Sequence, residues 1–253
     1  MISNIAGIGV VVDSRTVSET AGEKAYRRIR ADIIFGRLVP GQKLKLDGLR
    51  DSYGVGVSTL RELLSRLASE GFVVAEGARG FDVAPVSPEN LKELANLRQL
   101  LESHALQHSF AAGDMEWEGR VVAAHHKLAS MERRMLTGDR GAPELWKRYD
   151  WEFHHALLSA CGSRVLLEAH AAVYDKYLRY QMIAVVFRGE TAAKEHQQLL
   201  DCALKRDAQK AKAILATHIQ DCVAYTLSNG MGRLFGDQTM RRRKAATPTF
   251  ASV

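Results

Sequence analysis

Residues 47–72 read DGLRDSYGVGVSTLRELLSRLASEGF, and their pattern specifies the fold of the N-terminal part of the chain. Asp47 is placed to cap a short helix, which Gly54 ends. A second helix follows with Ser58 or Thr59 as its cap and with four leucines on one face. Two short helices joined by a tight turn predict a helix-turn-helix, whose second helix enters the major groove of DNA.

The flanking residues complete a winged helix-turn-helix over residues 21–86. Upstream, a helix begins near Glu23 and ends at Gly36, where a left-handed cap favours glycine. Downstream, residues 72–75 and 81–84 are short apolar strands, and the turn between them contains two glycines and an arginine. The pattern predicts a small β-hairpin wing with a basic tip.

Residues 87–230 have a helical pattern throughout. The sequence Ser-Pro-Glu at 87–89 is typical of a helix start, and five later breaks divide the region into six helices. Their loops are short enough for an antiparallel all-α bundle, so the fold class is mainly α. Residues 1–20 are predicted to form a flexible arm and residues 231–253 a basic, disordered tail.

Four potential metal ligands stand at positions of the bundle where an amphipathic helix presents apolar side chains. They are Asp150, His154, His196 and His218, which come from three predicted helices. Three imidazoles and one carboxylate suit a divalent metal ion, with zinc first and nickel, iron or manganese as alternatives. Each histidine taken singly is also compatible with a core residue that is hydrogen-bonded to a neighbour.

Arg98 interrupts the apolar face of the first bundle helix. A buried guanidinium needs an anion, and Glu102 four residues later or Asp150 across the bundle are structural candidates. The functional alternative is a carboxylate ligand bound between Arg98 and the metal. Counting the metal, Asp150 and Arg98 leaves a formal surplus of about two positive charges, which favours a small di- or hydroxycarboxylate effector.

Composition narrows the class of protein further. The 253 residues are 46% hydrophobic and 25% charged, an ordinary globular composition, and no apolar run approaches the roughly 20 residues of a membrane span. The three cysteines are odd in number and far apart, which favours a reducing, cytoplasmic location over a disulfide framework. The net charge is +6, and basic residues concentrate between Lys24 and Arg79.

The motifs together resemble a known family. Residues 39–44, 53–62, 70–73 and the Arg-Gly-Phe of 79–81 are similar to the DNA-binding domain of GntR regulators. The C-terminal bundle with its aspartate and histidines resembles the FCD effector domain of the FadR subfamily, and the Arg-Gly-Phe wing is similar to that of carbon-starvation-induced regulators. The resemblance covers roughly residues 21–230. It implies a homodimeric regulator, with operator DNA and a small organic acid as partners.

Seven residues of the N-terminal domain are candidate DNA contacts. Arg61 lies in the first turn of the second helix, where a guanidinium reads guanine, and the resemblance gives it the same role; pairing with a nearby glutamate is the alternative. The other six are placed to contact phosphates or the minor groove, although each is also compatible with a capping, solvated or mobile side chain: Lys43, Lys45, Arg50, Ser58, Thr59 and Arg79.

Three other functions stay open at this level. A metal-dependent hydrolase would use the same ligands, but no His-Glu-x-x-His motif or nucleophile elbow accompanies them. A regulator that senses the metal ion itself and a helical interaction module with structural histidines are the others. The histidines at 104, 108, 125 and 126, together with Glu116, are expected to be solvated, and His155 to face away from His154.

Overall fold

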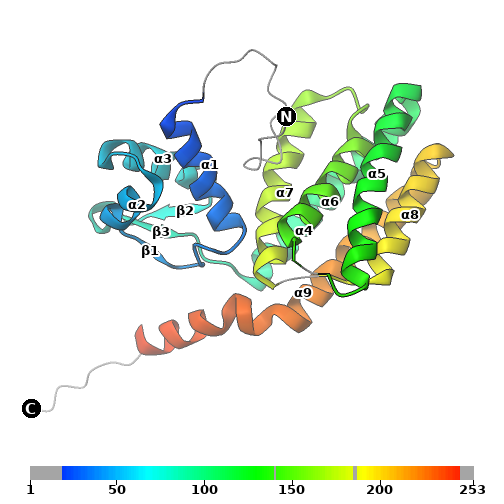
Figure 1. Ribbon diagram of the computed structural model, residues 1–253. Coiled ribbons are helices and arrows are strands. Elements are labelled where there is room, and N and C mark those ends of the chain that lie inside the picture. The colour runs from blue at the N-terminus through cyan, green and yellow to red at the C-terminus, as the bar shows by residue number, and fades with distance from the viewer. Residues whose placement is uncertain (1–18, 140, 185–186, 246–253) are drawn as a thin grey trace, which may run out of the picture.

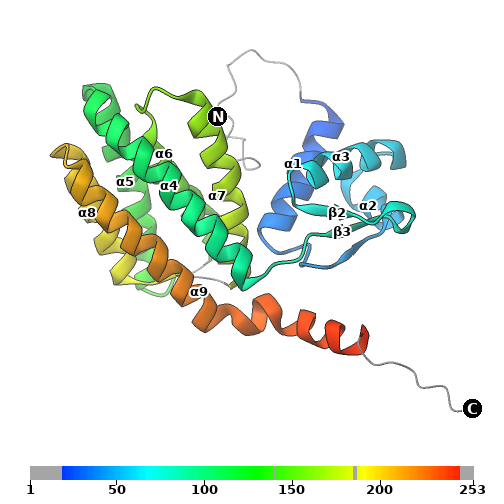
Figure 2. The same ribbon diagram turned by 180° about the vertical axis from the view of Figure 1, so that it is seen from behind.

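The computed structural model describes residues 19–139, 141–184 and 187–245, so residues 1–18 of the arm predicted at residues 1–20 lie outside the described residues. Figure 1 shows a small head beside a larger bundle of helices, and Figure 2 shows the same arrangement from behind. The head, residues 21–86, contains α1 (Ala21–Ile34), β1 (Lys43–Leu44), α2 (Leu46–Tyr53), α3 (Val57–Ser69), β2 (Val73–Ala75) and β3 (Phe81–Val83). The bundle contains α4 (Pro88–Ala112), α5 (Met115–Leu136), α6 (Pro143–Leu158), α7 (Arg164–Ala184), α8 (Glu190–Leu204) and α9 (Ala208–Ala245).

The head has the predicted winged helix-turn-helix. Gly54 ends α2 in the left-handed conformation, with φ of 70°, and its N–H donates to Arg50 O. The helix starts differ from prediction, because Lys45 occupies the N-cap position of α2 and Gly56 occupies that of α3. Asp47 is therefore not a cap but lies in the first turn of α2. In α3 the Gly56 carbonyl accepts from Leu60 N at 2.9 Å, so the helix begins one residue before Ser58.

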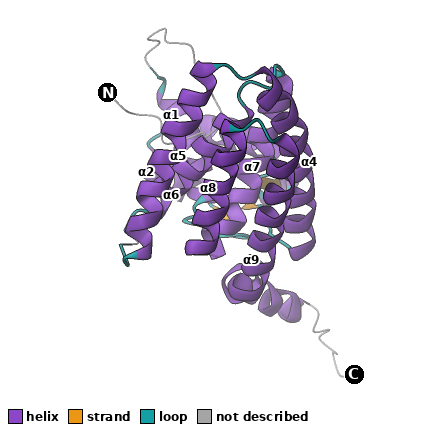
Figure 3. Ribbon diagram, turned by 90° about the vertical axis from the view of Figure 1, so that its right-hand side faces the viewer, coloured by secondary structure: helices purple, strands orange, loops and turns teal. Residues whose placement is uncertain are grey.

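The wing is a hairpin of β2 and β3, as predicted, with a single 3₁₀ turn (Gly77–Arg79) at its tip. A third strand, β1, pairs antiparallel with β3 and makes a sheet of order β1–β3–β2. This strand is only two residues long, so the alternation of lysine and leucine there was too short to predict a strand. The sheet is small, and helices dominate the molecule (Figure 3).

The core of the head continues into the bundle. Ile29, Leu60 and Phe72 are fully buried there together with Tyr174 and Leu178 of α7. An ion pair of 2.8 Å between Arg30 Nη1 and Asp175 Oδ2 also joins α1 to α7. The two parts therefore share apolar packing along α7.

Six helices form the bundle, as the breaks in the sequence predicted. Ser87 caps α4 by accepting from Asn90 N at 3.1 Å, and Pro88 takes the first helical position. The last helix does not end at residue 230 as predicted but continues to Ala245, while residues 246–253 lie outside the described residues. Good helix formers such as methionine, leucine, arginine and lysine surround the glycines that suggested an end. None of the helices in the described part of the chain combines the length and the apolar composition that a membrane span requires.

Candidate functional site

The recognition helix α3 presents a polar outer face. Ser58 and Arg61 are exposed and Thr59 is half-buried, while the leucines of α3 are buried on the opposite side. No side chain caps α3, so the capping role predicted as an alternative for Ser58 and Thr59 is wrong. The Arg61 side chain has no ion-pair partner among the described residues, whereas Arg66 lies 3.1 Å from Glu23 on α1. The side chain of Arg61 is therefore free to contact a base.

The other candidate DNA contacts lie on the exposed surface of the head. Arg79, at the wing tip, is 83% exposed and 3.8 Å from Glu76. Lys43 and Arg50 are about half exposed, with weak pairings to Asp82 at 3.4 Å and to Asp51 at 3.1 Å, and Lys45 is exposed at the start of α2. None of these pairings buries the charge, so all four cations remain accessible to phosphate.

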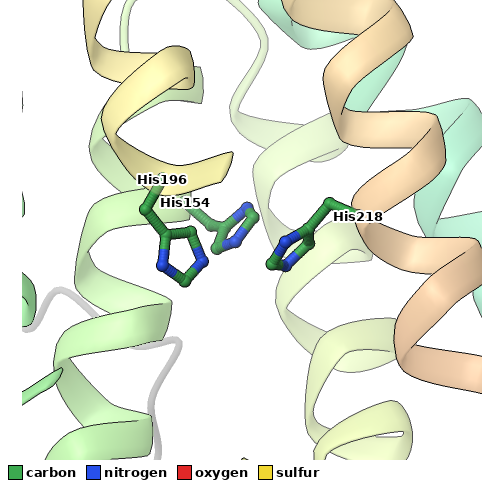
Figure 4. A group of neighbouring side chains, drawn as sticks. All are labelled: His154, His196 and His218. Atoms are coloured by element: carbon green, nitrogen blue, oxygen red, sulfur yellow. The ribbon is translucent and has the colours of Figure 1, made fainter. Parts of the chain in front are cut away.

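In the bundle, three of the four predicted metal ligands converge. Figure 4 shows His154 of α6, His196 of α8 and His218 of α9 with their rings turned toward one another. A ring nitrogen of each lies within 4.8 Å of those of the other two, and all three side chains are buried. Asp150, one turn before His154, has Oδ1 at 3.4 Å from His196 Nε2. Among the described residues no other such group of three forms.

A glutamate stands behind each of these histidines. Nδ1 of His196 is 2.7 Å from Glu132, Nδ1 of His218 is 2.7 Å from Glu195, and Nδ1 of His154 is 3.2 Å from Glu102. Such carboxylates hold a histidine in the tautomer that frees Nε2 for a metal. Nε2 of His196 is buried without a hydrogen-bond partner, and a metal ion would satisfy it.

The glutamates were missed by sequence reasoning, although one of them carries a visible signal. Glu132 follows Leu128 by four residues and precedes Met135 by three, so it interrupts an apolar stripe as the histidines do. Glu195 adjoins His196 in the chain and gave no such signal. Glu102 was considered only as a partner of Arg98.

The electrostatics favour the neutral form of the His154 and His218 imidazoles beside an ionised carboxylate. Burial lowers the pKa of His218 to about 3 even though a hydrogen bond to Glu195 opposes the shift, and burial likewise lowers the pKa of His154. Burial alone would raise the pKa of Asp150, but Lys147 and the histidines hold it below its usual range. Neutral imidazole and ionised carboxylate are the forms that bind a metal.

Arg98 reaches the same site. Its Nε lies 2.5 Å from Glu102, and its Nη2 lies 3.2 Å from His154 Nδ1. Glu102 is thus its structural partner, and the guanidinium also faces the histidine cluster. A second arginine, Arg188, was missed because its position was predicted to be a loop; it pairs with Glu195, and its Nη2 is 3.1 Å from His218 Nδ1.

These side chains change the charge balance derived from the sequence. Three cations face four carboxylates, which leaves the protein part of the site with one formal negative charge: Arg98, Lys147 and Arg188 against Glu102, Glu132, Asp150 and Glu195. A divalent ion would make the site positive by one unit, not by two as the sequence count gave. One carboxylate group of a ligand would neutralise it.

The histidines that sequence reasoning set aside do not belong to the cluster. His104, His108 and His126 are exposed as expected, and so is Glu116. His125 is not solvated as expected: it is buried, with its ring 5.2 Å from that of Phe153. It lies on the inward face of α5, so its burial follows from the helical period.

His155 turns away from His154, as expected, and stacks on Trp151 with ring centroids 4.7 Å apart. His170 was not singled out from the sequence, yet it is fully buried with Nε2 at 2.8 Å from Glu102. It therefore extends the polar network of the site along α7.

A winged helix-turn-helix joined to a helical domain with a buried histidine cluster defines a class, the DNA-binding transcriptional regulators. The family model of bacterial regulatory proteins of the gntR family matches residues 21–83, and that of the FCD domain matches residues 93–221. The chain belongs to the GntR family of bacterial transcriptional regulators and carries an FCD domain.

Relatives of known sequence and structure agree with this assignment. The chain is 34% identical over 213 residues to the HTH-type transcriptional regulator BphR of Paraburkholderia xenovorans (strain LB400), covering 83% of this chain and 87% of BphR. It is 30% identical to the HTH-type transcriptional repressor GlaR of Escherichia coli (strain K12), covering 77% and 90% of the two chains. Among solved structures, E. coli McbR/YncC shares the fold, with a TM-score of 0.70 at 18% identity over 83% of this chain and 98% of that one.

Proposed function

We propose that this regulator is a cytoplasmic homodimeric repressor whose FCD domain binds a divalent metal ion and a small organic acid, and that the acid changes its affinity for operator DNA. One observation carries the proposal: three buried histidines converge, a carboxylate stands behind each of them, and Nε2 of His196 has no hydrogen-bond partner. The repressor role is proposed by analogy with GlaR, which is a transcriptional repressor. The homodimer follows from the way helix-turn-helix proteins read two half-sites.

The donor set favours zinc among the divalent ions. Three imidazole nitrogens and one aspartate oxygen form a borderline ligand set, which suits zinc and leaves nickel, iron and manganese as alternatives. Asp150 lies beside His196, so it is positioned to be the fourth ligand. The metal would supply a positive centre among buried side chains and so attract an anion.

Arg98 is the residue proposed to bind the acid. Its guanidinium lies against His154 and over the rings of Tyr174 and Tyr177, at 4.7 and 5.0 Å from their centroids. A hydroxycarboxylate or dicarboxylate would place one carboxylate at the metal, where the charge count leaves room for one negative charge. A second polar group would accept a hydrogen bond from Arg98.

On the DNA side, the proposal divides the head into two kinds of contact. Arg61 reads a guanine in the major groove through a bidentate hydrogen bond. Ser58 and Thr59 of α3 and the cations of the head contact the backbone, which adds affinity without sequence preference: Lys43, Lys45, Arg50 and Arg79.

The test begins with the metal content of the purified protein. About one metal per chain is expected for the native sequence, a large loss for His196→Ala, and no loss for the control His104→Ala, whose side chain is exposed. An operator is then selected from random duplex DNA, and its dissociation constant is measured against a panel of hydroxy- and dicarboxylates with and without chelator. An effect of an acid only on the metal-loaded protein supports the proposal.

The other outcomes assign the rival functions. Reversible loss or gain of DNA binding on chelation, with no response to any acid of the panel, would make the metal ion itself the signal. Absence of metal from the native protein would leave the histidines a structural role. Steady turnover of a carboxylate ester or amide would make the bundle an enzyme, the role that hydrolytic metal sites with open positions perform.

A further inference from the structure

One buried side chain belongs to both parts of the molecule. The ring of Tyr174 is fully buried in the core of the head, together with Ile29, Leu60 and Phe72. Its hydroxyl donates a hydrogen bond of 2.6 Å to Oδ2 of Asp150, beside the histidine cluster. Tyr174 is therefore part of the core of the head, and it contacts the candidate metal site both with its hydroxyl and with its ring, over which Arg98 lies at 4.7 Å.

The next residue of α7 continues the path into the head. Asp175 is 4% exposed and pairs with Arg30 Nη1 at 2.8 Å, and Arg30 Nε lies 3.0 Å from Glu70. Glu70 is the C-cap of the recognition helix α3. Two consecutive residues of α7 are thus linked on one side to Asp150 and on the other to the end of the helix that reads DNA.

On the site side, the acceptor of Tyr174 is itself a candidate ligand. The two oxygens of Asp150 are divided between neighbours: Oδ2 accepts from Tyr174, and Oδ1 faces His196 at 3.4 Å. A carboxylate that rotates or shifts to coordinate an ion must change the hydrogen bond to Tyr174. Because the ring of Tyr174 is fully buried among side chains of both the head and the bundle, it cannot follow such a shift without moving its neighbours.

We propose that Tyr174 is a positioning residue that fixes Asp150 and transmits occupancy of the metal site to the DNA-binding head through Asp175, Arg30 and Glu70. This inference rests on the proposed metal site. The coupling is a free energy shared by two sites, so it acts in both directions. Metal binding alters operator affinity, and operator binding alters metal affinity by the same factor.

Tyr177 supplies a matched control. It lies three residues later on α7, is buried equally, and faces Arg98 at a similar distance, 5.0 Å against 4.7 Å for Tyr174. Its ring packs in the core of the bundle, not in that of the head. The hydrogen bonds of Asp150 come from Tyr174 and Lys147 among the described residues, so Tyr177 has no part in them.

The experiment compares full-length Tyr174→Phe with Tyr177→Phe and the native chain, after removal of metal and titration with zinc alone. Zinc stoichiometry, the operator dissociation constant and deuterium uptake of α1 and of α8 are measured for each. In the native chain and in Tyr177→Phe, zinc should protect α8, alter uptake in α1 and change the dissociation constant by about 5- to 150-fold. In Tyr174→Phe, zinc should still bind and protect α8, but the change in operator affinity should stay within about twofold.

Reciprocity gives a readout that a merely structural role would not move. Saturating operator DNA should shift the zinc affinity of the native chain and of Tyr177→Phe, but not that of Tyr174→Phe. Arg30→Lys tests the same path from the head without touching the site: it keeps a cation for Asp175 but loses the fork that also reaches Glu70, so it should weaken the response to zinc. It remains informative if Tyr174→Phe fails to fold.

The outcomes separate this inference from the proposed function. If the native chain binds no zinc and α8 is not protected, the metal site itself is wrong. If zinc binds but the head of the native chain does not respond, or if Tyr174→Phe responds as fully as Tyr177→Phe, the coupling through Tyr174 is overturned while the metal site stands.

Discussion

Replacing Arg61 by alanine should weaken operator binding without weakening the fold. The side chain is exposed on α3 and has no ion-pair partner among the described residues, so its removal should change the free energy of unfolding by no more than about 0.5 kcal/mol. A bidentate contact with guanine contributes about 1–3 kcal/mol, so affinity for a single half-site should fall by about 5- to 150-fold. Fluorescence anisotropy on a duplex with one half-site, at fixed salt, measures this loss directly.

Two control variants separate base reading from charge and from folding. Lys45→Ala removes a phosphate contact, so it should weaken operator and scrambled duplexes alike and reduce the salt dependence by about one unit of slope. Arg66 lies on the same helix but pairs with Glu23 and stacks at 3.8 Å from the ring centroid of Tyr26. Arg66→Ala should therefore lower the melting temperature instead. An equal loss of affinity for operator and scrambled DNA in Arg61→Ala would refute the assignment of a base contact.

Two other pairs of variants and removal of the metal should change metal affinity or stability. Glu132→Gln should lower metal affinity about 10- to 100-fold, since it removes the carboxylate behind one ligand, whereas Glu168→Gln, on an exposed face, should leave a zinc titration unchanged. Chelating the metal, when its free concentration was a hundred times the dissociation constant, should lower the free energy of unfolding by about 2.7 kcal/mol and the melting temperature by about 5–10 °C. An unshifted melting curve would argue against a metal that binds the folded state. Gly113→Ala should destabilise the fold by about 1–3 kcal/mol, because its Cβ would lie 2.5 Å from the Trp117 ring. Gly119→Ala has open space around it and should stabilise α5 by about 0.5–1 kcal/mol. Equal melting temperatures of the two variants would contradict both expectations.

Local signals predicted the fold correctly where one stretch of chain contains the whole pattern. The turn at Gly54, the hairpin wing and the six bundle helices each depend on residues close in sequence. The errors lie where two local options have similar free energy. Either Gly56 or Ser58 can precede α3, and the chain around Gly230 can either end a helix or continue it.

The candidate site was predictable only in part for a different reason. His154, His196 and His218 each break an apolar stripe on their own helix, and that signal is readable in one dimension. Which carboxylate stands behind each histidine depends on how helices pack, and Glu102 is 52 residues from His154 in the chain. The period of a helix says which face is buried but not which neighbour it meets.

Tyr174 and Leu178 lie in the sequence of the C-terminal domain but in the core of the N-terminal one. The boundary that sequence comparison draws between residues 83 and 93 is therefore not a boundary in packing. A chimera that joins this head to the bundle of a relative would lose the complementary surface of α7 unless residues 174–178 were transplanted with it. Recombination among such regulators is then constrained, because a new head can pack only on a bundle whose α7 is complementary to the core of that head.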